Sequence, residues 1–205
     1  MKEKDWTRLL TEDYITMANT ETSTCQRHFL PNRVELTSPN TDWSLTWAAC
    51  RQAGVPPELA SFLWLMLHDL LSSQARLHRM GATTSPTCRM QDCPEVGTLQ
   101  HELLHCVKND GVGQSLVSCF KHYVPHLHAE AVLRLEFGNI EESLSLQLTL
   151  MTAITLRFLW KERELGSTIR TYRVRAEIEL YITQLRTTRI RSAPEKLSEM
   201  LNLIF

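Results

Sequence analysis

The chain has 205 residues, of which 43% are apolar and 22% are charged, and its formal net charge at pH 7 is -1. This length and apolar content allow a buried core in one domain or two small units. The near-neutral charge argues against a strongly basic nucleic-acid-binding protein. Glycines are few, and apolar residues recur with helical rather than alternating spacing, so we expect a mainly α-helical fold.

Residues 1–40 are rich in Ser, Thr, Asn and charged side chains, which predicts a polar, loosely ordered leader. The chain does not open with a basic start, an apolar run and a cleavage site of small residues. We therefore expect an intracellular protein, nuclear or cytoplasmic, that is not secreted.

Two helices are expected next. Asp42 is a suitable N-cap for a short helix from Trp43 toward Gly54, and Pro56-Pro57 opens the following one. The second helix has a wide apolar face made of Leu59, Phe62, Leu63, Met66, Leu70 and Leu71. Because charged and polar residues bracket this run closely, it is too short to cross a membrane, and we assign it to the core.

Three thiols and one imidazole occur within residues 88–106 with the spacing C-x4-C-x7-H-x4-C. Structural zinc sites are closed tetrahedra of Cys sulfur and His nitrogen with short spacings of this kind. We predict that Cys88, Cys93, His101 and Cys106 bind one structural zinc ion. Such a set leaves no open coordination position, so the ion should hold structure rather than activate water.

The remaining cysteines, Cys25, Cys50 and Cys119, show no paired spacing, which argues against a secreted disulfide framework. We expect buried, reduced thiols in a reducing compartment, where metal binding is favoured over disulfide formation. The alternative for the cluster itself is a set of reduced core cysteines on a helix that also carries His101.

The identity of the nitrogen ligand depends on local helix geometry. On an ideal α-helix His101 and Cys106 are about 140° apart, so the helix must begin near His101 or loosen before Cys106. His105 is the alternative ligand, but adjacent side chains rarely reach one metal. The letters His101-Glu102-Leu-Leu-His105 also match the metalloprotease motif H-E-x-x-H, in which Glu102 would be the general base. We favour the zinc site with three cysteines over the metalloprotease motif, because only the zinc site accounts for the cysteines on either side of His101.

Four further helices are expected after the metal-binding segment. Gln114 to Tyr123 reads as a helix ended by Pro125, and the uncharged run 143–156 continues into charged residues 161–164 as a buried helix emerging into solvent. A long helix from Ile169 to about Arg189 has the apolar stripe Val174, Ile178, Ile182 and Leu185, and Pro194 precedes a last apolar helix.

Charge is distributed unevenly along the chain. Residues 157–205 hold ten basic and six acidic side chains. Arg186 and Arg189 have no acidic residue at helical spacing, and Pro194 lies between Arg191 and Glu195, so we treat the three arginines as unpaired. Such a cluster can neutralise phosphates, although three arginines make only a weak site. Arg76, Arg79 and Arg89 flank the cysteines and are further candidate nucleic-acid contacts, with plain surface exposure as an equal alternative.

The run Ser61–Gly81, the loop ending at Pro86, the first Cys pair and Thr98-Leu-Gln-His-Glu-Leu-Leu-His-Cys106 together resemble the zinc-binding C-terminal region of LINE-type (non-LTR) retrotransposon reverse transcriptases. The likeness covers about residues 40–205. This sequence departs from the family pattern in two ways. Its first cysteine pair has four residues between the cysteines, where the family more often has fewer, and its turn contains Pro94 and Gly97.

The resemblance implies that residues 41–125 are a helix pair with a zinc knuckle and that residues 126–205 are a helical tail with a basic end. It implies a partner in RNA or single-stranded DNA and, as a further candidate, the polymerase portion of the same element. We find no paired polymerase aspartates, phosphate loop or nucleophile elbow, so we expect no enzyme activity. The chain would be a detached or truncated C-terminal piece; the alternatives are a helical protein-interaction module or a relic without selected function.

Overall fold

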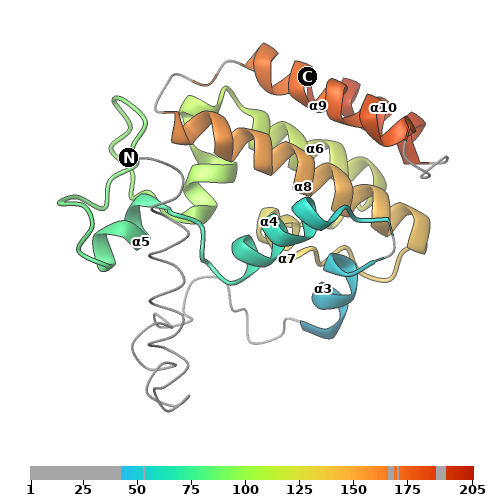
Figure 1. Ribbon diagram of the computed structural model, residues 1–205, viewed down its shortest axis with the longest axis horizontal. Helices are drawn as coiled ribbons and strands as arrows, with labels where there is room; N and C mark the ends of the chain where they lie inside the picture. The colour runs from blue at the N-terminus through green and yellow to red at the C-terminus, as the bar shows by residue number, and fades with distance from the viewer. Residues whose placement is uncertain (1–42, 53, 166–168, 170, 188–192) are drawn as a thin grey trace. The chain divides into compact units, whose positions relative to one another are not determined.

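The computed structural model describes residues 43–52, 54–165, 169, 171–187 and 193–205, and residues Thr41–Phe205 form one compact unit (Figure 1). The leader predicted for residues 1–40 and the N-cap predicted at Asp42 lie outside the described residues. The division of the rest of the chain between residues 125 and 126 stays a prediction.

The first two described helices are α3 (Trp43–Cys50) and α4 (Pro57–Leu67), as the sequence predicts. Pro57 is the first residue of α4, where its missing N–H costs nothing. The predicted apolar face of α4 is buried at Leu59, Phe62, Leu63 and Met66, whereas Leu70 follows the helix and is only half-buried.

Helix α8 (Glu142–Glu164) runs through the middle of the unit and contacts α3, α4, α6 (Val112–Tyr123) and the C-terminal helices. Its uncharged stretch is buried from Gln147 to Leu156, with Leu148, Leu150, Met151 and Ile154 inaccessible to solvent. Because Thr149, Thr152 and Thr155 are buried as completely as these apolar residues, α8 is covered on all sides here and forms the centre of the core (Figure 1).

Helices α9 (Thr171–Thr187) and α10 (Ala193–Ile204) lie side by side and complete the unit (Figure 1). The stripe predicted for α9 is confirmed, because Val174, Ile178, Ile182 and Leu185 are all buried. The other face of α9 carries its charges, including an ion pair of 2.8 Å between Arg175 and Glu179.

The mainly α-helical fold is confirmed, and no strand occurs among the described residues beyond an isolated bridge between Thr87 and Val96. None of the helices in this part of the chain is long and apolar enough to cross a membrane. Cys50 and Cys119 are free and buried, as predicted.

Two short helices were not predicted, α5 (Gln74–Arg79) and α7 (Ala129–Arg134). Each is only six residues long, too short to display an apolar period, and α5 is marked in the sequence mainly by its N-cap Ser73. The expectation that α8 emerges into solvent at residues 161–164 is wrong in part. Glu162 and Arg163 are only 2% and 1% exposed, because their positions continue the buried face of α8.

Gly113 sets the distance between α6 and the turn that carries Leu103 and Leu104. A Cβ on Gly113 would lie 2.6 Å from the Cα of Leu104 and closer still to the carbonyl oxygen of Leu103. We predict that Gly113→Ala lowers the free energy of unfolding by about 1–3 kcal/mol, because the backbone must move apart. The measurement is urea unfolding followed by circular dichroism.

Ser118→Ala, at an exposed position of the same helix, is the matched control and should change the free energy of unfolding by less than about 0.5 kcal/mol. A Gly113→Ala protein as stable as this control would contradict the close packing of α6.

Candidate metal centre

A short loop closed by the bridge between Thr87 and Val96 holds the first two cysteines. The backbone N–H of Cys88 donates to the carbonyl oxygen of Glu95 at 2.8 Å, and that of Cys93 donates to Met90 at 3.1 Å. Asp92 adopts a left-handed φ of 59°, which turns the chain so that Cys93 faces Cys88 across the loop. Four residues between the cysteines therefore suffice to bring both thiols to one point.

The other two ligands are brought together by one turn of π-helix, His101–His105. The backbone N–H of Cys106 donates to the carbonyl oxygen of His101 at 2.7 Å, a bond that spans five residues instead of four. Widening the turn cancels the angular mismatch that an α-helix would impose on this spacing. The predicted loosening before Cys106 is therefore confirmed, and its form is a π-turn.

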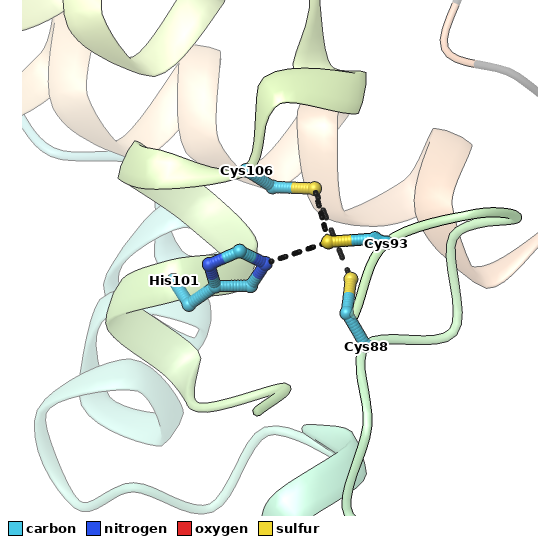
Figure 2. Close-up of side chains that lie close together, drawn as sticks. All are labelled: Cys88, Cys93, His101 and Cys106. Carbon is cyan, nitrogen blue, oxygen red and sulfur yellow. Dashed lines mark hydrogen bonds between the residues drawn. The ribbon is translucent and has the colours of Figure 1, made fainter. Parts of the chain in front are cut away.

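The structure brings all four predicted ligand residues together, with their candidate ligand atoms within 4.8 Å of one another. The Sγ atom of Cys106 lies 3.8 Å from that of Cys88 and 3.9 Å from that of Cys93, and Cys93 Sγ lies 3.3 Å from His101 Nε2. Figure 2 shows the four side chains converging on one space from the loop and from the π-turn.

These separations fit zinc. A tetrahedron with zinc–sulfur bonds of about 2.3 Å has sulfur–sulfur edges of about 3.8 Å, and its sulfur–nitrogen edges are slightly shorter. The donor set of three sulfurs and one imidazole is also the one that structural zinc sites use. The three thiols are buried and His101 is half-buried, so the centre is closed to substrates.

The neighbouring guanidinium of Arg163 affects the ligands. Burial raises the pKa of the Cys88 thiol to about 11, with Arg163 acting in the opposite direction. For Cys106 burial also acts to raise the pKa, but hydrogen bonding and the charge of Arg163 prevail and the pKa is lowered. Burial and Arg163 lower the pKa of His101, which keeps its imidazole neutral, as metal binding requires.

Arg163 and Asn109 are the residues that sequence reasoning missed. Arg163 donates to Cys88 Sγ at 3.1 Å and to Asn109 Oδ1 at 2.6 Å, although it lies far from the cysteines in sequence. The helical spacing of Leu156, Trp160 and Arg163 was an available signal, because it places Arg163 on a buried face. No local pattern marked its contact with Cys88.

The metalloprotease alternative does not fit this geometry. His105 is exposed and lies 3.2 Å from Gln100 Nε2, outside the cluster, because the π-turn removes the helical face it would share with His101. Glu102 is fully buried, and its carboxylate accepts from the backbone N–H of Gln74 at 3.2 Å. A general base would instead have to face a water on the metal.

The six predicted nucleic-acid arginines are not all described. Arg76 donates to the carbonyl oxygen of Asp69, Arg79 pairs with the Asp69 carboxylate at 3.0 Å, and Arg89 donates to the carbonyl oxygen of Ser72 at 2.6 Å. These three therefore have partners within the chain. Arg186 lies on α9 but its side chain is not described, and Arg189 and Arg191 lie outside the described residues.

Comparison with known proteins agrees with the geometry. Residues 29–112 match the family described as zinc-binding in reverse transcriptase, and this range contains all four ligand residues. Neither the curated proteins nor the solved structures gave a match. A segment of the chain is thus similar to the zinc-binding segment of reverse transcriptases, while α7, α8, α9 and α10 lie beyond the matched range.

We predict one zinc ion per chain in the purified protein, and we expect Cys88→Ser and Cys106→Ser to lose it, because each removes a thiolate from a four-ligand site. The measurement is elemental analysis under reducing conditions. Cys50→Ser, which removes a buried thiol outside the cluster, is the control and should keep the metal. Zinc retained in both cluster variants would contradict the assignment.

The two histidines of the π-turn give a second, sharper prediction. His101→Ala should weaken zinc binding at least tenfold, whereas His105→Ala should leave the affinity within about twofold, because only His101 joins the cluster. Competition with a chromophoric chelator measures both. The reverse ranking would show that His105 is the nitrogen ligand.

Proposed function

We propose that this protein is a non-catalytic nucleic-acid-binding module stabilised by one structural zinc ion. The observation that carries the proposal is the closed three-cysteine, one-histidine cluster inside a segment matching the family described as zinc-binding in reverse transcriptase. A centre with four protein ligands has no position for a substrate or a reactive water, which supports a structural role.

Zinc bound to Cys88, Cys93, His101 and Cys106 would supply folding free energy, because the ligands come from two segments that must fold to meet. Structural zinc contributes about 10–16 kcal/mol of apparent binding free energy in small finger peptides. The loop of residues 88–96 has little core of its own, so its order would depend on the metal. Nucleic acid would then be presented with a preformed surface.

The candidate phosphate contacts fall into two groups. Arg76, Arg79 and Arg89 already have partners within the chain, so binding phosphate would require them to exchange these contacts. Arg186, Arg189 and Arg191 form the second group, and their proposed role rests on the charge pattern of the sequence. We propose the second group as the principal contact with RNA or single-stranded DNA and the first as an accessory one.

We further propose that the chain derives from a LINE-type element and corresponds to a detached or truncated C-terminal piece of its reverse transcriptase. The polymerase portion of that element is a candidate partner. The match to a zinc-binding module, and not to a polymerase domain, supports a role without catalysis. We place the protein inside the cell, in the nucleus or the cytoplasm.

A protein-interaction module is the second candidate. Helix α9 exposes Tyr172 and Leu180, which are 66% and 60% accessible, beside its charged residues. In this candidate function a partner would cover these two apolar side chains. In this version the zinc only braces the fold and α9 makes the interface.

The salt dependence of binding distinguishes the two candidate functions. Binding of a single-stranded oligonucleotide through three arginines should weaken with salt, with a slope of about -2 in log affinity against log salt. We predict that Arg186→Gln, Arg189→Gln and Arg191→Gln together remove most of this slope. Fluorescence anisotropy with labelled RNA and DNA of the same sequence measures it.

The matched control removes three cations that have partners within the chain, as Arg51→Gln, Lys161→Gln and Arg175→Gln. It should leave most of the slope in place. An affinity that does not change with salt would contradict nucleic-acid binding through the C-terminal arginines. So would a salt slope that falls equally in both triple variants.

A further inference from the structure

Arg163 is a fully buried cation at the end of α8, with 1% of its side chain exposed. It lies outside residues 29–112, the range that matches the zinc-binding family. An arginine is almost never buried without partners that compensate its charge. A negatively charged or accepting group is therefore expected beside the Arg163 guanidinium.

The guanidinium of Arg163 makes two hydrogen bonds, and one of them is to a candidate zinc ligand. Its Nη1 donates to Asn109 Oδ1 at 2.6 Å, and its Nη2 donates to Cys88 Sγ at 3.1 Å. The nearest carboxylate, Glu102 Oε1, is 3.9 Å from Nη2, which is too far for a hydrogen bond. The sulfur is thus the closer acceptor, and Glu102 adds a longer-range attraction.

Neighbouring groups fix the guanidinium in this orientation. Asn109 donates through Nδ2 to the carbonyl oxygen of Glu102 at 2.7 Å, which leaves its Oδ1 free to accept from Arg163. Glu102 is in turn held by the backbone N–H of Gln74 at the start of α5. Asn109, which is held by the backbone carbonyl of Glu102, therefore orients the guanidinium toward Cys88.

The charge of a filled centre explains the need for such a cation. Three thiolates contribute -3 and zinc contributes +2, which leaves a net charge of -1 on a buried site. A buried net charge is costly unless a partner of opposite sign lies beside it. A hydrogen bond to a ligand sulfur also disperses the negative charge of the thiolate.

We propose that Arg163 is a positioning residue of the metal centre, whose guanidinium compensates the charge of the zinc–thiolate cluster through Cys88 and so makes α8 part of the zinc site. This inference rests on zinc binding by the four ligands. It extends the site beyond the segment that matches the zinc-binding family, and it makes zinc affinity depend on the C-terminal half of the chain.

The test compares zinc affinities of whole-chain variants by chelator competition at fixed pH. Glu102→Gln with Arg163→Met removes the buried cation and the carboxylate together, so the metal-free protein keeps no uncompensated charge from this pair, whereas the charge of the filled centre loses its counter-charge. We expect its affinity to fall about 10- to 100-fold, the usual cost of losing a group that supports a metal ligand. Glu102→Gln alone keeps the guanidinium and should not weaken binding.

Arg163→Lys is the conservative variant and should retain part of the affinity, because an ammonium keeps the charge but cannot bond Cys88 and Asn109 in one plane. The proposal is overturned if the double variant folds and binds zinc as tightly as Glu102→Gln alone. A wild-type chain that binds no zinc would instead overturn the metal site itself, so the two failures are distinguishable.

Cobalt(II) substitution gives a readout that does not depend on the folding of the methionine variant. The sulfur-to-cobalt charge-transfer band responds to hydrogen bonding at the thiolates. We expect this band to shift between Glu102→Gln and Glu102→Gln with Arg163→Lys, because the guanidinium bond to Cys88 is replaced. An unchanged band together with unchanged zinc affinity would mean that Arg163 only packs against the site.

Discussion

The geometry of the metal centre depends on one constraint, which is that His101 and Cys106 must face the same point although they are five positions apart in the sequence. The chain meets it with a single π-turn closed by the bond from Cys106 to His101. That turn also sets the position of α6, because Gly113 packs directly against Leu103 and Leu104. The local cost of a π-turn is thus compensated by the ligand geometry and the close helix packing it permits.

The second requirement is compensation of the negative charge of the thiolates. A closed site with three thiolates concentrates negative charge where water cannot reach, and the structure places Arg163 beside it. Because Arg163 is carried by the central helix α8, the site is joined to the core that Leu148 and Ile154 help to form. The zinc-binding segment and the helical body are therefore linked through one cation, in addition to their apolar packing.

The sequence predicted the long elements and the clustering of the four candidate ligand residues for physical reasons. Apolar periodicity over many residues identified α8 and α9, and ligand spacing identified the cluster, because both signals are local. Helix α5 was missed because six residues carry too little periodicity, and the burial of Arg163 was missed because a charged residue ordinarily marks the end of a buried helix. Its contact with Cys88 is made by tertiary packing, which no local pattern records. The arginines after residue 185 stay a prediction.

The central claim is that three sulfurs and one imidazole nitrogen hold a zinc ion. X-ray absorption at the zinc edge of the purified protein tests it most directly. The account predicts three sulfur ligands at about 2.3 Å and one nitrogen at about 2.0–2.1 Å. A shell with two or fewer sulfurs, or with an oxygen ligand from water, would contradict a closed structural centre at Cys88, Cys93, His101 and Cys106.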